Sequence, residues 1–292
     1  MQLPEIERLC RAVVPGAGSI ELKSLGAGLI SETYRVARDG VAYTLKVALE
    51  HRPDLGLDLP WEVRVLERAA SVGLAPRLVF CDPEGAILLS RWVEGHSWES
   101  YEAAAPANLE RIAVLLRRVH TLAVPIPARP ITPLQWIEIY AAALSRRTAT
   151  SIDPALRSAA LSRAQSLREL PDAVGVVCHS DLHAMNLIQE DDSLILLDWE
   201  YAHVTDPLWD LAGWCANNDF AADVQRALLI RYLGIAPNSR QWQRFRLLLA
   251  LYDYVCLLWS RLYLSVRRDA AAVAGRARLL DARLRLPAHY AA

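Results

Sequence analysis

Residues 177–200 read VCHSDLHAMNLIQEDDSLILLDWE, a segment in which acidic, histidine and asparagine side chains interrupt apolar runs. His179, Asp181 and Asn186 follow the spacing H-x-D-x-x-x-x-N, and Asp198 comes directly after the apolar run LILL. The runs NLI and SLILL, joined by the turn-forming QEDD, predict a β-hairpin. This hairpin would bring Asn186 close to Asp198, and amide and carboxylate oxygens are ligands that suit Mg²⁺. The segment therefore predicts a magnesium site.

Asp181 would lie on the loop before this hairpin, which we call the catalytic loop. There its carboxylate is able to accept a proton from a substrate hydroxyl. Phosphoryl transfer needs this combination, because metal ions hold the phosphates while a carboxylate orients the attacking oxygen. The spacing thus favours a phosphotransferase site, with Asp181 as the catalytic base and Asn186 and Asp198 as the metal ligands.

Two other interpretations of this segment stay open. His179, Asp181 and His183 are ligand types that Zn²⁺ accepts, so HSDLH could belong to a zinc hydrolase. The other histidines form no second cluster, however, and zinc would leave Asn186 without a role. The remaining alternative is a polar loop without chemistry. On the phosphotransferase interpretation, His179 supports the loop through hydrogen bonds.

A phosphotransferase also needs a phosphate-covering loop, a lysine and a glutamate that orients the lysine. Gly26 and Gly28 offer a glycine turn between predicted strands, although such turns are common. Lys46 is a cation inside the apolar strand YTLKVA, and an edge lysine that extends to solvent is the alternative. Glu62, in a helix that begins near Pro60, is the favoured partner of Lys46, with Glu67 as second choice. A role of Glu62 in the helix dipole alone is the rival interpretation.

The order of elements predicts an α+β fold of two lobes. Residues 20–48 and 77–95 are rich in strand signals, whereas most of 108–170 and 206–285 has helical periodicity. We expect an N-terminal nucleotide-binding lobe over residues 1–92 and a helical lobe with the catalytic loop and acceptor site over 93–292. The linker near Ser90 and Trp92 would offer backbone groups to an adenine ring.

Composition bounds the class of protein. The chain has 292 residues and a formal net charge of −1, which gives no reason to expect a nucleic-acid partner. Its five cysteines are far apart and odd in number, which is typical of reduced thiols in the cytoplasm. The apolar stretch 247–264 contains Asp253 and Arg261, so we expect a buried helix rather than a membrane span. No protein partner is evident.

The motifs HSDLHAMNLI and LILLDWEYAHVTDPLWDLA resemble those of the aminoglycoside phosphotransferase and choline kinase family, especially its bacterial choline kinase and thiamine kinase branch. The resemblance covers roughly residues 20–260. It implies a protein-kinase-like fold that uses ATP and Mg²⁺, with Lys46 on the phosphates, Glu62 as its partner, and Asp210 bracing the catalytic loop. Relatives often have an asparagine near the position of Ser31, which this chain lacks. The phosphate contacts of the glycine loop therefore depart from the family pattern.

The resemblance also implies a small-molecule acceptor, because DWEYAHVTDPLWD leaves no room for the activation segment of protein kinases. The resemblance favours choline or a similar amino-alcohol as the acceptor, and aromatic faces beside a carboxylate are able to bind quaternary ammonium groups. The residues considered for the acceptor site are Glu200, Trp214, Asp253, Tyr254 and Trp259. Aromatic side chains on helices more often belong to the core, and a buried Asp253 could pair with Arg261. A thiamine kinase, an aminoglycoside-type phosphotransferase and a catalytically inactive nucleotide-binding module are the alternatives.

Overall fold

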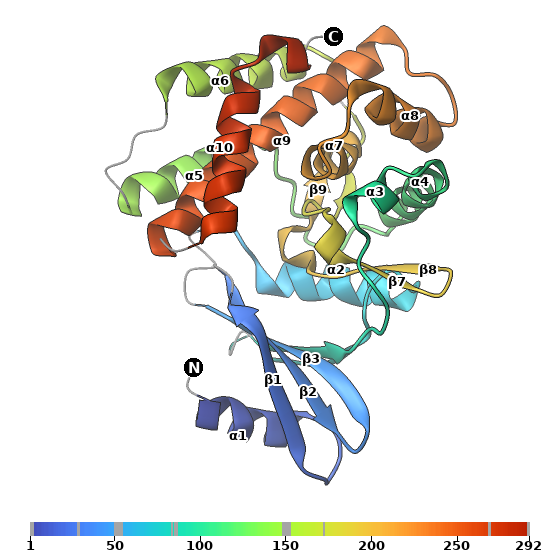
Figure 1. The fold of residues 1–292 in the computed structure, drawn as a ribbon, viewed down its shortest axis with the longest axis vertical. Helices are drawn as coiled ribbons and strands as arrows, with labels where there is room; N and C mark the ends of the chain where they lie inside the picture. Colours follow the sequence, from blue (N-terminus) through green and yellow to red (C-terminus); the bar gives the residue numbers. More distant parts are fainter. Residues whose placement is uncertain are drawn as a thin grey trace.

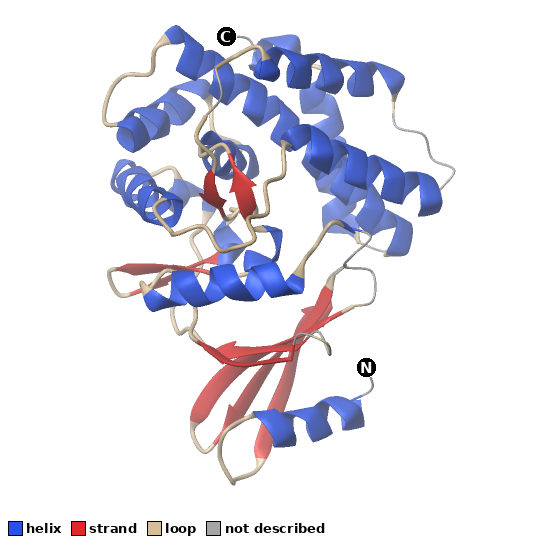
Figure 2. Ribbon diagram, turned by 180° about the vertical axis from the view of Figure 1, so that it is seen from behind, coloured by secondary structure: helices blue, strands red, loops and turns tan. Residues whose placement is uncertain are grey.

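The computed structural model describes residues 3–27, 30–49, 55–82, 84, 87–147, 153–171, 173–267 and 270–290. As predicted, a strand-rich N-terminal part is followed by a helix-rich part (Figures 1 and 2). The N-terminal elements are α1 (Leu3–Val13), β1 (Ile20–Ala27), β2 (Ser31–Arg38), β3 (Val41–Ala48), α2 (Leu59–Ser71), β4 (Leu78–Asp82) and β5 (Ile87–Arg91). The elements that follow are α3 (Ser100–Ala103), α4 (Pro106–His120), α5 (Pro133–Arg147), α6 (Pro154–Arg168), β6 (Val176–Cys178), η2 (Ala184–Asn186), β7 (Leu187–Glu190), β8 (Ser193–Leu196), η3 (Trp199–Tyr201), β9 (His203–Thr205), α7 (Leu208–Asn217), α8 (Ala222–Leu233), α9 (Ser239–Val266), α10 (Ala271–Leu284) and η4 (Pro287–Tyr290).

The N-terminal strands form an antiparallel sheet, which has the order β1-β2-β3-β5-β4 within the described residues. Asp39 and Gly40 connect β2 to β3 with φ of 52° and 75°, the positive values that a two-residue hairpin turn requires. Alternate residues such as Val36 and Leu45 are buried, and Ile6 of α1 packs in the same hydrophobic cluster. The sheet is therefore covered on one face by α1 and presents Lys46 of β3 to the rest of the molecule.

Helix α2 begins and ends where its sequence predicts. The side chain of Asp58 caps the N-terminus by accepting a hydrogen bond from Trp61 N at 2.9 Å, and Gly73 follows the helix with φ of 71°. Trp61 also donates through Nε1 to Ala202 O at 2.7 Å, and it belongs to the large hydrophobic core of the helical part. Because α2 packs in the core of the helical part, the two parts share a hydrophobic core. The lobe boundary expected at residue 92 therefore stays a prediction.

The linker after β5 packs closely against the β7–β8 hairpin. His96 and Gln189 exchange backbone hydrogen bonds of 3.2 and 2.9 Å. Gly95 has φ of 138°, and a Cβ atom built there would lie 2.1 Å from Gln189 O. Glycine is therefore required at this position both by its backbone conformation and by the close approach. The contact fixes the linker relative to the hairpin that follows the catalytic loop.

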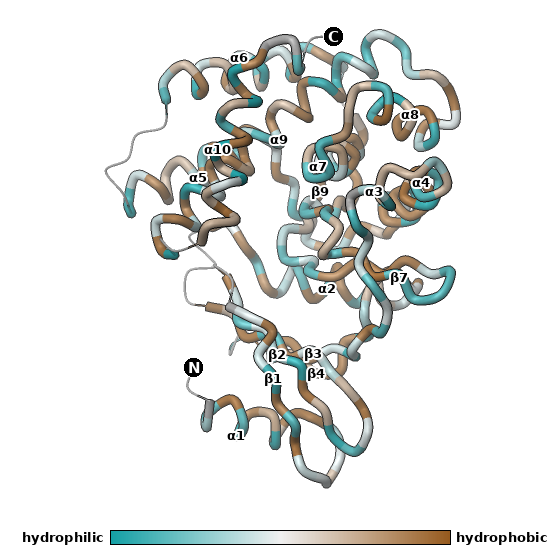
Figure 3. The backbone as a smooth tube through the Cα atoms, viewed as in Figure 1, coloured by the Kyte–Doolittle hydropathy of each residue, from teal (hydrophilic) through white to brown (hydrophobic). Residues whose placement is uncertain are grey.

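Helix α9 is the central element of the helical part, and apolar residues recur along it (Figure 3). Asn238 and Gln241 form a capping box at its N-terminus. Among the described residues, α9 alone has the length and composition of a membrane span, and 67% of its most apolar window is buried. Asp253 at its centre is fully buried and ion-paired with Arg283 of α10. These features fit the core helix that the sequence predicts, although the partner of Asp253 is Arg283 and not Arg261, which pairs with Asp281.

Candidate active site

The structure has a cavity of about 210 Å³ lined by Asp181 and a second cavity of about 230 Å³ lined by Asp198. The second lies between the sheet and the helical part and is lined by Lys46, Glu62, Ser90, Trp92 and Asp198. These residues come from β3, α2, β5, the linker and the end of the β7–β8 hairpin. The structure thus brings together five residues that the sequence analysis assigned to the nucleotide and metal.

The predicted glycine loop has a different outcome. Gly26 lies in β1 with φ of 137°, and its neighbour Leu25 lines the cavity. Gly28 lies outside the described residues. Ser31 is buried at the start of β2, opposite Ala48, and neither it nor Gly26 is among the described residues that line the cavity.

Lys46 lies in a cluster of carboxylates. Its Nζ atom is 3.8 Å from Glu62 Oε1 and 3.1 Å from Asp198 Oδ1, and it also forms an ion pair with Glu200. Burial lowers the pKa of Lys46, but the three carboxylates outweigh burial and hold that pKa above its usual value. The lysine is therefore charged and fixed in position, as a group that binds phosphates must be. The sequence analysis placed Glu200 in the acceptor site, whereas the structure places it against Lys46.

The predicted hairpin places Asn186 and Asp198 side by side. Leu187 pairs with Leu196 at the open end of the hairpin, and Leu197 N donates to Asn186 O at 2.9 Å. Asp198 follows with φ of 56°, a left-handed conformation that turns the chain into η3. The prediction of a hairpin that brings these two residues together is confirmed.

Asp181 is held by the amide of Asn186. Asn186 Nδ2 donates to the backbone oxygen and to Oδ2 of Asp181, at 3.0 Å in both cases. Because Nδ2 makes both contacts, the Oδ1 atom of Asn186 is left for another partner. Asn186 Oδ1 and the half-exposed carboxylate of Asp198 are hard oxygen ligands, and the donor set fits Mg²⁺.

The charge of Asp181 is also set by its neighbours. Burial raises its pKa, but His183, with Nε2 3.5 Å from Asp181 Oδ2, His179 and the amide of Asn186 lower it below the usual value. Asp181 is therefore a carboxylate at neutral pH. This is the protonation state that a proton acceptor requires.

Asp210 holds the backbone of the catalytic loop. Its oxygens accept from His179 N at 2.9 Å and from Ser180 N at 2.7 Å, and His120 Nε2 lies 3.1 Å from Oδ2. Ser180 has φ of 69°, so the two backbone donors stabilise a turn that the chain would otherwise avoid. His179 is fully buried, and its Nε2 lies 2.7 Å from Leu197 O. These are the supporting positions that the sequence predicts for His179 and Asp210.

The zinc interpretation of HSDLH finds no support in this geometry. Across the described ranges, the group with three potential ligand atoms within 4.8 Å of one another is His120, Cys178 and Asp210. Both oxygens of Asp210 already accept hydrogen bonds, so this group is a buried support for the loop. His179 Nε2 contacts the backbone oxygen of Leu197, so it is not available as a zinc ligand together with Asp181 and His183.

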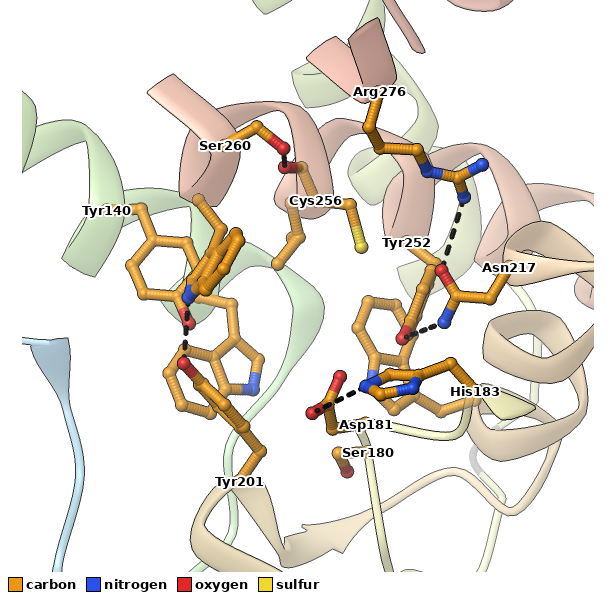
Figure 4. A pocket seen from close by; sticks show the side chains of 14 residues that line it. Tyr140, Ser180, Asp181, His183, Tyr201, Asn217, Tyr252, Cys256, Ser260 and Arg276 are labelled. Carbon is orange, nitrogen blue, oxygen red and sulfur yellow. Dashed lines mark hydrogen bonds and ion pairs between the residues drawn. The ribbon is translucent and has the colours of Figure 1, made fainter. Parts of the chain in front are cut away.

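Asp181 belongs to the lining of the first cavity (Figure 4). Its lining comes from the catalytic loop and from helices that are far apart in sequence, namely Trp136, Tyr140, Ser180, Asp181, His183, Tyr201, Trp209, Asn217, Tyr252, Val255, Cys256, Trp259, Ser260 and Arg276. The rings of Trp136 and Tyr140 are 5.4 Å apart, and those of Trp136 and Tyr201 are 6.2 Å apart. An acceptor bound here would place its hydroxyl at Asp181 with aromatic faces beside it.

Of the residues that the sequence analysis considered for the acceptor, Trp259 lines this cavity. Trp214, Asp253 and Tyr254 do not. Trp214 is fully buried and packs edge-on against Trp98, while Asp253 is bound by Arg283 and Tyr290. Tyr254 is on the opposite side of the helix turn from Tyr252 and is 1% exposed. The three assignments are corrected, because these side chains serve the core.

The sequence analysis did not identify four of the residues that line this cavity, namely Trp136, Tyr140, Asn217 and Arg276. The spacing of Trp136 and Tyr140, one helical turn apart on α5, is a signal that could have identified a shared aromatic face. Asn217 and Arg276 carry no such signal, because α7 and α10 meet only in the folded chain.

His203 contacts Tyr201 and Trp136 of the cavity lining, and its burial makes the stability of the fold depend on pH. It is fully buried, its Nδ1 lies 2.9 Å from Tyr201 O, and Trp136 Nε1 donates to its Nε2 at 3.3 Å. Burial lowers the pKa of His203 to about 4. The unfolded chain therefore binds a proton near pH 6.5 that the folded chain takes up only near pH 4, so stability falls as the pH is lowered through this interval.

We expect the free energy of unfolding to fall by about 3 kcal/mol more in the wild type than in His203→Gln between pH 7.5 and pH 4. Urea unfolding at several pH values measures this difference. Parallel pH curves for the two proteins would show that His203 does not titrate with unfolding.

Comparison with known proteins agrees with this geometry. A profile of the phosphotransferase enzyme family matches residues 21–248. The protein LicA of Haemophilus influenzae is 49% identical over 35 residues, which is 12% of this chain and only 13% of that relative. Choline kinase LicA from Streptococcus pneumoniae has a similar structure, with a TM-score of 0.79, 22% identity, and coverage of 96% of this chain and 98% of that chain. A structure of LicA in complex with AMP has a TM-score of 0.80 and 20% identity, and covers 99% of this chain and 98% of that chain.

The fold is therefore the bilobal, protein-kinase-like α+β fold that the sequence predicts. More specifically, the chain belongs to the phosphotransferase enzyme family.

Proposed function

We propose that the protein is a small-molecule kinase that transfers the γ-phosphate of ATP, with Mg²⁺, to the hydroxyl of choline or a similar amino-alcohol. Lys46, fixed by Glu62, would bind the phosphates, and Ser90 and Trp92 would border the adenine. Asn186 and Asp198 would hold Mg²⁺, which neutralises phosphate charge. Asp181 would accept the hydroxyl proton as the oxygen attacks phosphorus in line, and His179 and Asp210 would keep the loop in place.

The observation that carries the choice of acceptor is the aromatic wall beside Asp181. Trp136, Tyr140, Tyr201 and Trp259 line one cavity, and Trp259 Nε1 donates to Tyr201 Oη at 2.8 Å, which fixes both rings. A cation over such faces gains about 0.5–2 kcal/mol from each favourable contact. A quaternary ammonium group could therefore bind here with its hydroxyl at Asp181.

The size of the cavity supports a small acceptor. Pockets for drug-sized ligands are roughly 300–1,000 Å³, and this cavity is about 210 Å³. An amino-alcohol suits it better than an aminoglycoside. Thiamine, a larger aromatic cation, is the second candidate because the same wall could stack against its rings. A catalytically inactive module is less well supported, because Asp181, Asn186, Asp198 and Lys46 are all present and adjacent.

The proposal is tested by measuring acceptor-dependent ADP release with choline, ethanolamine, other amino-alcohols, thiamine, aminoglycosides and sugars. We expect the amino-alcohols to give the highest kcat/KM. Tight binding of Mg-ATP without ADP release for any acceptor would instead support the inactive module.

A further inference from the structure

The acceptor cavity has two walls of different chemistry, with Asp181 between them (Figure 4). Tyr140 and Tyr201 belong to the aromatic wall. On the opposite side lie Arg276 and Asn217, with His183 next to Asp181. We call this side the polar wall and define it by Arg276, Asn217, Tyr252 and Trp209. A trimethylammonium group would use only the aromatic wall.

A chain of hydrogen bonds fixes the polar wall. Arg276 Nη2 of α10 donates to Ala216 O at 2.8 Å and to Asn217 Oδ1 at 3.2 Å. Asn217 Nδ2 donates in turn to Tyr252 Oη at 3.1 Å and to Leu182 O at 2.8 Å. The guanidinium of Arg276 is thus tied to the catalytic loop through one side chain. Preorganised donors of this kind lose little entropy when they bind a ligand.

The charge of Arg276 is only partly balanced. Its Nη1 lies 3.6 Å from Asp219 Oδ1, but Asp219 is also ion-paired with Arg283 and its side chain is 53% exposed. Asp181 is the carboxylate that lines the cavity within the described part of the chain, and it has to accept the substrate proton. A bare cation would therefore meet an arginine in this cavity without a second carboxylate to offset it.

Two buried donors of the cavity have no protein partner. Trp209 and Ser180 line the cavity. Trp209 Nε1 and Ser180 Oγ are buried and form no hydrogen bond to any described residue. Trp209 is 2% exposed, and its ring is 5.1 Å from that of Tyr252 in the polar wall. Buried donors are almost always satisfied. Unpaired buried donors also occur away from the cavity, at Trp214 Nε1 for example, so Trp209 does not by itself indicate a ligand, and Arg276 carries the argument.

We propose that the natural acceptor is an amino-alcohol that carries a second oxygen group, a carboxylate, carbonyl or hydroxyl, which binds to the polar wall through Arg276. Its amine or ammonium group would lie against the aromatic wall while its reacting hydroxyl is at Asp181. This inference rests on the proposed function and narrows the substrate class within it. It makes Arg276 a specificity-determining residue.

Matched acceptors test the inference. We would compare choline with N,N,N-trimethylserine, which adds a carboxylate to the same skeleton, and ethanolamine with serine, serinamide and serinol. The oxygen-bearing member of a pair should have a kcat/KM about tenfold or more above that of the bare member, as expected for a hydrogen bond to a charged group. Serine against serinamide and serinol distinguishes a carboxylate from a neutral oxygen.

The variant Arg276→Met should reduce this preference by about tenfold or more. Arg278→Met is the matched control, because Arg278 is exposed on the same helix, and it should keep the wild-type preference. A wild-type preference for the bare alcohols, or an unchanged preference in Arg276→Met, would overturn the inference.

Failure of the proposed function is separable from failure of this inference. If no acceptor supports ADP release, calorimetric titration of the same pairs into the protein with a non-hydrolysable ATP analogue still measures binding. Tighter binding of the oxygen-bearing member that is lost in Arg276→Met would support the polar wall. Equal binding, or none by either member, would contradict it.

Discussion

Asp181→Asn is expected to lower kcat by about 10²- to 10⁴-fold while leaving the affinity for ATP near that of the wild type. The amide cannot accept the hydroxyl proton, but it has almost the same shape as the carboxylate. Its oxygen can still accept the hydrogen bond that Asn186 Nδ2 makes to Asp181 at 3.0 Å. Asp181 lines the acceptor cavity and not the nucleotide cavity, so ATP binding should be spared. Steady-state kinetics and calorimetry measure the two effects separately.

Asp191→Asn is the matched control for this substitution, because Asp191 is an exposed aspartate in the turn of the β7–β8 hairpin. It should have wild-type kcat. If Asp181→Asn retained near-normal turnover, the catalytic base would have to be another group. A large loss of ATP affinity would mean that Asp181 acts through the metal or the nucleotide.

The nucleotide side of the site could be predicted because its residues lie in local patterns. Asn186 and Asp198 flank a hairpin whose strands and turn lie within residues 187–196, so their proximity follows from pairing alone. Lys46 is evident as a cation in an apolar strand, and Glu62 as an acid in the first turn of a helix with clear N- and C-terminal signals. Each of these inferences needed only the order of neighbouring elements.

The acceptor side could not be predicted in the same way. Its cavity is assembled from α5, α7, α9 and α10, and only tertiary packing decides which face of each helix points inward. Asp253 illustrates the difficulty, because an acid among tyrosines suggests a ligand site. Its partner Arg283 lies 30 residues further on, in a helix whose position the sequence does not reveal. Glu200 turns towards Lys46 because the left-handed Asp198 redirects the chain just before it.

The largest expected effect on nucleotide binding is that of Asp198→Ala. Wild-type protein should bind ATP more tightly with Mg²⁺ than with EDTA, whereas this variant should have similar, weak affinity in both conditions. The physical reason is that Asp198 offers the half-exposed carboxylate beside Asn186, and Mg²⁺ sites in proteins use only one or two carboxylates. Loss of this ligand should weaken Mg-dependent ATP binding by about 100-fold or more, since loss of a group that merely supports a metal ligand already costs 10–100-fold.

Asp192→Ala, on the exposed turn of the same hairpin, should bind Mg-ATP like the wild type. Thermal unfolding of all three proteins separates a local effect from a loss of fold, because Asp198→Ala also removes a partner at 3.1 Å from the buried Lys46 while leaving the Glu62 and Glu200 ion pairs. Retention of the Mg²⁺ enhancement in folded Asp198→Ala would assign the metal to other oxygens. In that case Asp198 would serve mainly to balance the charge of Lys46, together with Glu62 and Glu200.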